Sequence, residues 1–247
     1  MQAGGDTVST ALAATLFYLS RNSESYERLQ SEIRTNFSTI DSICAGRALS
    51  RCHYLRACLD EAMRLSPPAP GSFWRETTGP GAFIDGVFVP AGYEVGVGIY
   101  ALHHNPRYFS DPYAFRPERF LLVETSEQRR CTISPNAPSS SMPTSQGSSP
   151  ETLSSNDVPG AHPDAGSAFA PFLLGPRTCP ARSLAYLEMS LLIARIIWSL
   201  DFRIVGHDGQ GEAGASWGEE RESEFRLWDI FSAVQRGPLL QFKKRED

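Results

Sequence analysis

Residues 172–182 read Phe172-Leu173-Leu174-Gly175-Pro176-Arg177-Thr178-Cys179-Pro180-Ala181-Arg182. The Gly-Pro pair predicts a loop, and the apolar-periodic segment 181–200 that follows predicts a helix. Cys179 therefore lies where a loop meets a helix start, and the helix dipole and the neighbouring Arg177 and Arg182 favour its thiolate. Such a thiolate is typical of a redox nucleophile or a metal ligand. The structural alternative is a buried, inert cysteine at a loop–helix junction.

The pattern Phe-x-x-Gly-x-Arg-x-Cys within this segment resembles the haem-binding loop of the cytochrome P450 family. The resemblance implies that Cys179 is the axial thiolate ligand of the iron of haem b. It also implies that Arg177 pairs with a haem propionate, that Phe172 packs near the sulfur and excludes water, and that Gly175 lets the backbone approach the macrocycle. Ala181 stands beside the cofactor at a position where the family usually has glycine, and it is small enough to be tolerated.

The segment 3–7, Ala-Gly-Gly-Asp-Thr, leads directly into the helix-forming residues 8–16. Two glycines and a threonine weaken a helix, which predicts a local bulge or groove that can hold a diatomic ligand and a water. The plain alternative is a loop and an N-cap at the start of the chain. The segment also resembles the oxygen-activating motif in the long central helix of the same family. That resemblance implies that Asp6 and Thr7 relay protons to O2.

A second motif lies in the helix predicted for residues 53–65, where Glu61 and Arg64 are one turn apart. Glu-x-x-Arg is a weak motif, because residues 127–130 match it too, and a surface ion pair is the plain alternative for both. Only the first copy sits in a well-formed helix followed by Pro-Pro. In the family this pair joins the Arg of a Pro-Glu-Arg-Phe segment, here Arg119, so the resemblance implies a buried structural triad.

Short strands are predicted between these motifs. Asp-Gly separates the β-prone residues 82–84 from 87–89, a strong hairpin signal, and residues 95–99 are a further candidate strand. Arg75 matches the second propionate-binding arginine of the family. His103 matches a position near the cofactor that commonly carries histidine, and a structural hydrogen bond is the role we expect for it.

We expect one domain of mainly α structure with small β-sheets, the cytochrome P450 fold, interrupted once. Residues 1–123 form its first part, and residues 169–247 form the second, with the cysteine loop, a helix and closing strands. Residues 124–168 contain no aromatic residue and are rich in Ser and Pro, so they cannot bury enough apolar area to offset their chain entropy. We expect a disordered insertion there, either a natural loop or unremoved non-coding sequence in a gene model. The closing strands are expected at 202–205, 225–230 and 239–242.

Composition excludes several classes of protein. The formal net charge of -5 gives no electrostatic footprint for nucleic acid. The five cysteines are odd in number and form no Cys-x-x-Cys pair, which favours a reducing compartment. The longest apolar run, 183–200, carries Glu188 and Arg195 and is not expected to span a bilayer. We therefore expect an intracellular chain, whereas the resemblance implies that full-length relatives sit on the endoplasmic reticulum membrane.

The resemblance implies a monooxygenase that inserts one oxygen atom of O2 into a small apolar organic substrate and reduces the other to water. Electrons are implied to come from NADPH through NADPH–cytochrome P450 reductase, which would dock near Arg182. Residues 93–106 also resemble fungal members that hydroxylate secondary metabolites. Two alternatives remain open. The chain can be a non-catalytic remnant that binds haem at best, or Cys179 can act as a redox thiol without haem, although no resolving cysteine lies nearby in sequence.

Overall fold

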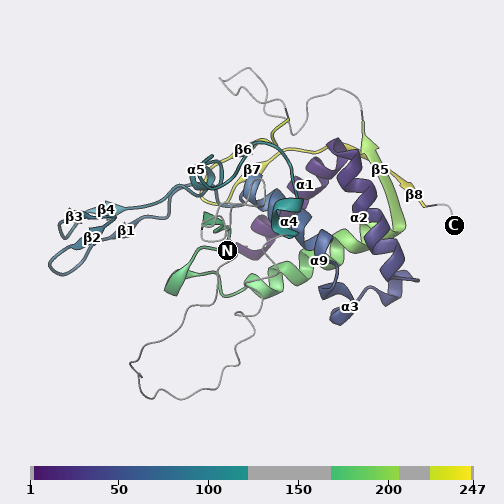
Figure 1. The fold of residues 1–247 in the computed structure, drawn as a ribbon, viewed down its shortest axis with the longest axis horizontal. Helices are drawn as coiled ribbons and strands as arrows, with labels where there is room; N and C mark the ends of the chain where they lie inside the picture. The colour runs from purple at the N-terminus through teal and green to yellow at the C-terminus, as the bar shows by residue number, and fades with distance from the viewer. Residues whose placement is uncertain (1–2, 122–167, 206–222, 246–247) are drawn as a thin grey trace, which may run out of the picture.

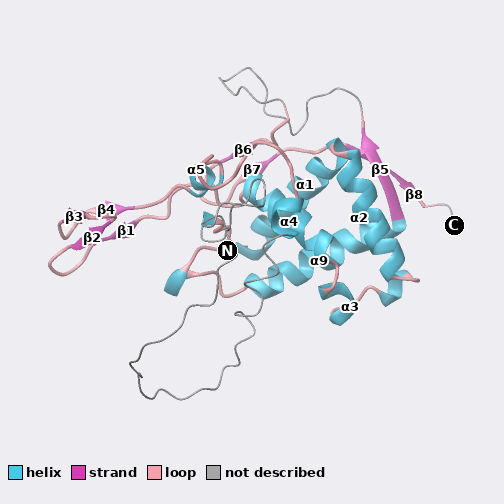
Figure 2. Ribbon diagram, in the orientation of Figure 1, coloured by secondary structure: helices cyan, strands magenta, loops and turns pink. Residues whose placement is uncertain are grey.

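The computed structural model describes residues 3–121, 168–205 and 223–245 (Figure 1). The expected insertion at 124–168 lies outside the described residues except for Ala168, which is buried and belongs to the folded part. The described part is helical with small antiparallel sheets, so the predicted fold class is confirmed (Figure 2). The helices are α1 (Ala3–Arg21), α2 (Ser23–Asn36), α3 (Arg47–Ser50), α4 (His53–Leu65), α5 (Ile99–His103), α6 (Glu118–Leu121) and α9 (Arg182–Ser199), with the short 3₁₀ turns η1 (Ile40–Ser42) and η3 (Gly175–Arg177).

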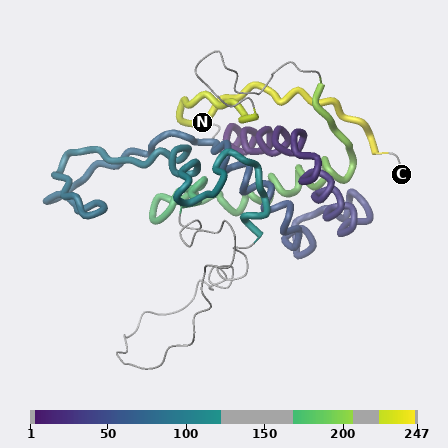
Figure 3. Tube along the Cα trace, turned by 45° about the horizontal axis from the view of Figure 1, so that its top comes forward, coloured from purple at the N-terminus to yellow at the C-terminus, as the bar shows by residue number. Residues whose placement is uncertain are grey.

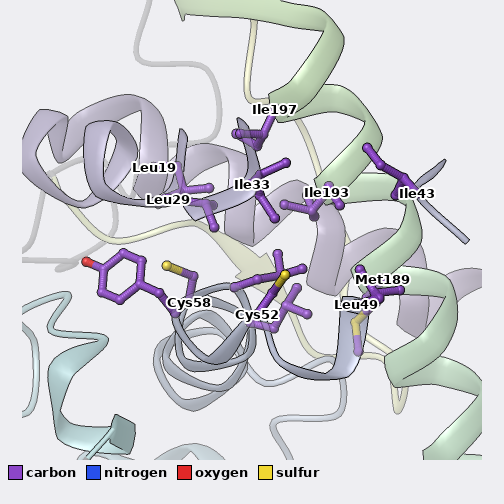
Figure 4. Close-up of a cluster of buried hydrophobic side chains, with 14 of the residues drawn as sticks. Leu19, Leu29, Ile33, Ile43, Leu49, Cys52, Cys58, Met189, Ile193 and Ile197 are labelled. Carbon is purple, nitrogen blue, oxygen red and sulfur yellow. The ribbon is translucent and has the colours of Figure 1, made fainter. Parts of the chain in front are cut away.

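Four helices, α1, α2, α4 and α9, surround one apolar interior together with the strand β5 (Leu200–Ile204). Leu19, Leu29, Ile33, Cys58 and Ile193 are buried there, and Figure 4 shows their side chains pointing into the same space. Leu29 and Ile33 are one turn apart in α2, and Ile193 lies one turn from the buried Met189 and Ile197 in α9, because one stripe of each helix faces the interior. Burial of these apolar side chains is what holds the helices together.

Helix α4 runs from His53 to Leu65, as the sequence predicts. It ends because Ser66 leaves the helical region of backbone space and Pro67, which follows, lacks an N–H and disfavours a helical residue before it. All its residues from Ala57 to Leu65 are buried, including the charged ones. A helix that is buried nearly all round is a central element, and α4 carries most of the polar contacts described below.

Two strand pairs form an arm that extends away from the helices (Figure 1). The strands β2 (Ala82–Ile84) and β3 (Val87–Val89) form the predicted hairpin, and Asp85 and Gly86 both have positive φ, as its tight turn requires. The strands β1 (Arg75–Glu76) and β4 (Glu94–Val95), which flank this hairpin in the chain, form the second pair. The predicted strand 95–99 is wrong beyond its first residue: Ile99 is buried and begins α5, which packs against α4.

The closing strands complete the fold. β5 pairs with β8 (Leu240–Lys244), and β6 (Leu227–Trp228) pairs with β7 (Val234–Gln235), so each predicted strand is present with shifted ends. Figure 3 shows the C-terminal segment running along α1. The Thr10 hydroxyl of α1 donates to the carbonyl of Ala233 over 3.2 Å, which fixes this contact. Within the described ranges, no helix has the length and apolar character needed to cross a membrane.

Candidate functional site

The cysteine loop, residues 169–181, closes on itself through backbone hydrogen bonds. The amide of Cys179 donates to the carbonyl of Phe172 over 2.8 Å, and the amide of Leu173 donates to the carbonyl of Ala170 over 3.0 Å. The Thr178 hydroxyl lies 3.3 Å and 3.2 Å from the carbonyls of Phe172 and Leu173. These bonds link residues at most seven apart, so the loop conformation is set mainly by its own sequence.

Cys179 is partly exposed at the end of this loop. Helix α9 begins three residues later, at Arg182, whose amide contacts the Cys179 carbonyl at 3.3 Å. Cys52 and Cys58 are buried, and burial raises the pKa of Cys52 to about 12 and the pKa of Cys58 well above its ordinary value. Those two thiols therefore stay protonated, and a thiolate ligand is not expected from them. Cys44 is exposed but lies outside any such loop.

Gly175 opens the η3 turn with a φ of +69°, a conformation that favours glycine over residues with a Cβ. A Cβ at this position would meet no heavy atom within 4 Å, so the space beside it is open. Leu174, next to it, is exposed, and so is the guanidinium-bearing Arg177. This arrangement fits a flat, apolar, anionic cofactor such as haem. It offers an accessible thiol, an open backbone face, an exposed apolar side chain and a cation.

The predicted structural triad is assembled in the structure. Arg64 donates from Nε and Nη2 to the two carboxylate oxygens of Glu61 over 2.8 Å and 2.9 Å. Arg119 Nε donates to the same carboxylate over 3.0 Å. The Arg64 and Glu61 side chains are fully buried, and Arg64 Nη1 also donates to the carbonyls of His103 and Pro112. Arg64, Arg119, the Glu61 carboxylate and several backbone carbonyls therefore share one buried network.

His103 connects this network to the cysteine loop. Its Nδ1 lies 3.2 Å from the Arg64 carbonyl, and its Nε2 accepts from the amide of Ala170 over 3.0 Å. The ring stacks on Phe169. Burial, and then the charge of Arg64, lowers the pKa of His103 to about 3, so the ring is neutral and one nitrogen can accept. The structural hydrogen bond expected of His103 is present, and neither ring nitrogen is left for a direct polar contact with a cofactor.

Asp6 and Thr7 lie in the first turns of α1. The helix begins at Ala3, so the alternative of a loop and N-cap over these residues is wrong. The helix runs unbroken from Ala3 to Arg21, and the groove expected at the two glycines stays a prediction. Asp6 is exposed and Thr7 is partly exposed, so both are accessible at one end of α1.

Arg75 and Ala181 complete the predicted set. Arg75 is exposed in β1, opposite Val95, and its guanidinium donates to the Trp74 carbonyl over 2.8 Å. The structure does not bring it into hydrogen-bond contact with the cysteine loop among the residues described. Ala181 is the exposed N-cap residue of α9, where its methyl group is accommodated.

Sequence reasoning missed one neighbour of the loop, Tyr186. Its ring lies 5.0 Å from that of Phe172, and its hydroxyl donates to Asp60 of α4 over 2.6 Å. The available signal was its place two turns after Cys179, on the stripe of α9 that faces the interior. An aromatic residue on such a stripe is read as ordinary core, and its polar partner comes from a distant helix.

Comparison with known proteins agrees with this geometry. The family model described as Cytochrome P450 matches residues 1–211. The cytochrome P450 monooxygenase AKT7 of Alternaria alternata is 39% identical over 99% of this chain and 42% of its own length. The monooxygenases poxM of Penicillium oxalicum and apf8 of Gibberella fujikuroi are 38% and 40% identical, over 98% of this chain and 38% and 58% of their own lengths. The chain thus spans roughly half the length of these fungal relatives. With the cysteine loop and the buried triad in place, this similarity shows that the chain belongs to the cytochrome P450 family.

Proposed function

We propose that this chain forms the cofactor-binding part of a monooxygenase that inserts one oxygen atom of O2 into a small apolar organic substrate. The cofactor is haem b, and the electrons come from NADPH through NADPH–cytochrome P450 reductase. The observation that carries the proposal is the closed loop that presents the accessible Cys179 beside the open face of Gly175. The fungal relatives, all named monooxygenases, support the reaction class.

The residues of the loop divide the work of holding the cofactor. Cys179 would bind the iron through its sulfur, as a thiolate. Arg177, exposed on the η3 turn, would pair with a propionate, and Arg75 would need its exposed side chain to turn from the Trp74 carbonyl to do the same. Phe172 would shield the sulfur from water. The bound haem-thiolate supplies the activation of O2.

Protons and electrons would reach the site from different residues. The Asp6 carboxylate and the Thr7 hydroxyl, both accessible on α1, would hold and pass protons toward O2. The exposed Arg177 and Arg182 flank Cys179 and would attract the acidic surface of a reductase. The resemblance of residues 93–106 to fungal hydroxylases supports a secondary metabolite as the substrate class.

The absorption spectrum of the chain, loaded with haem, reduced and exposed to carbon monoxide, tests the proposal. A strongly red-shifted Soret band that is lost in Cys179→Ser and kept in Cys44→Ser is the expected result, because only a thiolate from the loop produces it. Retention of that band in Cys179→Ser would overturn the ligand assignment. A band of the neutral-ligand type in the native chain would favour the alternative of a non-catalytic chain that binds haem at best.

A further inference from the structure

A polar cluster behind the cysteine loop joins α4 to α9; its members Asp60 and Tyr186 are buried, and Arg56 is partly exposed. Asp60 of α4 accepts at Oδ1 from the Tyr186 hydroxyl over 2.6 Å and at Oδ2 from Arg56 Nε over 2.9 Å. The Arg56 guanidinium carbon also lies 3.4 Å from the centre of the Tyr186 ring. The Asp60 carboxylate therefore binds both the Tyr186 hydroxyl and the Arg56 guanidinium, and the guanidinium also covers the Tyr186 ring.

This cluster reaches Cys179 through one aromatic contact. The Tyr186 ring packs against Phe172 at 5.0 Å with an interplanar angle of 49°. The carbonyl of Phe172 accepts the amide hydrogen of Cys179 over 2.8 Å. The chain of contacts from Asp60 to the Cys179 backbone thus consists of a hydrogen bond, a ring contact and a hydrogen bond. Each step is close enough to transmit a displacement of the Tyr186 ring to the loop.

The protonation states of Tyr186 and Asp60 favour the hydrogen bond between them. Burial first, and then the charge of Asp60, raises the pKa of Tyr186 well above its ordinary value, so the phenol keeps its proton and donates it. Burial also raises the pKa of Asp60, although Arg56 and the Tyr186 hydroxyl act against that rise. A buried carboxylate depends on such donors. Removing the hydroxyl would leave one of its oxygens without a partner and release the ring.

We propose that Tyr186, held by Asp60 and Arg56, is a positioning residue that fixes the cysteine loop and with it the place of the Cys179 sulfur. This rests on the proposed function in so far as the sulfur is the haem ligand. A loop that is free to shift moves the sulfur from the place where it would bind the iron, so the fraction of iron-bound thiolate falls. The Tyr186 ring holds Phe172 in the loop, and the Tyr186 hydroxyl and the Asp60 carboxylate hold the ring in place.

Tyr54 provides a matched control on the other side of α4. Its hydroxyl donates to the Glu118 carboxylate over 2.9 Å, and the Arg28 guanidinium carbon lies 4.3 Å above its ring. Tyr54→Phe therefore deletes the same kind of bond beneath the same kind of cation, away from the cysteine loop. The Glu118 and Arg28 side chains are half exposed, so this variant tests the loss of a tyrosine hydroxyl bond as such, whereas a positioning role belongs to Tyr186 alone.

The test compares Tyr186→Phe and Tyr54→Phe with the native chain in two measurements. One is the ratio of thiol-type to thiolate-type Soret band of the reduced, carbon monoxide-bound, haem-loaded chain. The other is the alkylation rate of Cys179 by iodoacetamide in the haem-free chain, read by peptide mass spectrometry. We expect Tyr186→Phe to raise both about tenfold, the change that corresponds to one lost hydrogen bond to a charged group. Tyr54→Phe should leave both near the native values.

Equal values for the two variants in both measurements would overturn the proposal. Should Tyr186→Phe fail to fold, Asp60→Asn provides the second variant, because its amide oxygen still accepts from Tyr186 while its amide nitrogen, a donor, cannot accept from Arg56. A smaller change in the same direction supports the proposal, and native values contradict it. If the native chain shows no thiolate band, the proposed function fails, while the alkylation rate still decides whether Tyr186 positions the loop.

Discussion

At the scale of single residues, His103 connects the buried triad to the cysteine loop. It bonds the Arg64 carbonyl on one side and the Ala170 amide on the other, while Arg64 bonds the His103 carbonyl in return. The buried triad thereby reaches the first residues of the cysteine loop. Because every one of these polar groups is buried, the network is stable only while each partner is present.

The pH dependence of stability should report on His103. Its pKa falls from 6.5 in the unfolded chain to about 3 in the folded one, so the folded state binds fewer protons between these values. Stability is complete above the unfolded pKa and falls as the pH drops through this window, by up to about 1.4 kcal/mol per pH unit. Urea unfolding of the native chain and of His103→Gln measures it. The His103→Gln chain should be less stable than the native chain at neutral pH. Its free energy of unfolding should also depend less on pH in this window, because the titrating group is gone.

The exposed His53 serves as the control for that measurement. His53→Gln measures what the loss of a histidine outside the buried network does to the slope. If His103→Gln shows the same slope as the native chain, the neutral buried histidine is not the source of the pH dependence.

The triad should respond strongly to loss of its shared carboxylate. Glu61→Gln keeps the shape but leaves Arg64 and Arg119 buried without a counter-charge, and the expected loss is about 3–5 kcal/mol in the free energy of unfolding. The exposed pair Arg116–Asp111 is the contrast, because its charges are solvated. Asp111→Asn should change stability by less than about 1 kcal/mol. Denaturant unfolding measures both, and similar losses would contradict a buried triad.

At the scale of elements, glycine affects stability differently in the cysteine loop and in α1. Gly175 has positive φ, so its backbone conformation depends on the absence of a Cβ. Gly4 lies in a helix with no atom within 4 Å of a Cβ placed on it. The loop needs Gly175 for its turn, whereas α1 would be more stable with another residue in place of Gly4.

Alanine substitutions should separate these two roles. Gly175→Ala should destabilise the chain by about 1 kcal/mol or more through backbone strain, although no neighbour blocks the added methyl group. Gly4→Ala should stabilise it by about 0.5–1 kcal/mol, because the unfolded chain loses freedom and the helix gains propensity. Thermal unfolding followed by circular dichroism tests both. A destabilised Gly4→Ala chain would mean that α1 does not start as an ordinary helix.

At the scale of the whole molecule, stability is concentrated in the helices. The interior gathers buried side chains from α1, α2, α4 and α9, whereas the hairpin β2–β3 on the extended arm is exposed at nearly every residue (Figure 1). Phe83 and Phe88 pack on one another at 5.2 Å, but both remain half exposed or more. The arm therefore has little buried apolar surface to resist opening.

Native-state hydrogen exchange should divide the chain accordingly. Amides of α4 from Ala57 to Leu65, where every residue is buried, should exchange only through global unfolding, and those of the hairpin β2–β3 should exchange through local opening. Leu59→Ala should speed exchange throughout α4 by removing a fully buried core side chain, at a loss of about 2–5 kcal/mol. The hairpin rates should stay unchanged in that variant. Equal protection of the arm and of α4 would contradict this division.

The sequence by itself determined the features that local backbone chemistry controls. Pro67 sets the end of α4, Asp85-Gly86 sets the hairpin, and the closed cysteine loop follows from bonds between near neighbours. It also indicated the Glu61–Arg64 pair, because one helical turn brings those side chains together. For the same local reason it was wrong for residues 95–99, where nothing nearby in the chain signals that Ile99 is needed in the interior.

Only the tertiary structure decided which distant groups meet. Tyr186 and Asp60 are 126 positions apart, and His103 and Ala170 are 67 apart. Arg119 and Glu61, 58 apart, were expected to meet only because of the family resemblance. No spacing rule connects such positions, because their distance depends on how α4, α9 and the loops pack around a shared apolar interior. A buried polar group must find a partner, but which partner it finds is fixed by the packing of whole elements rather than by the residues beside it in the chain.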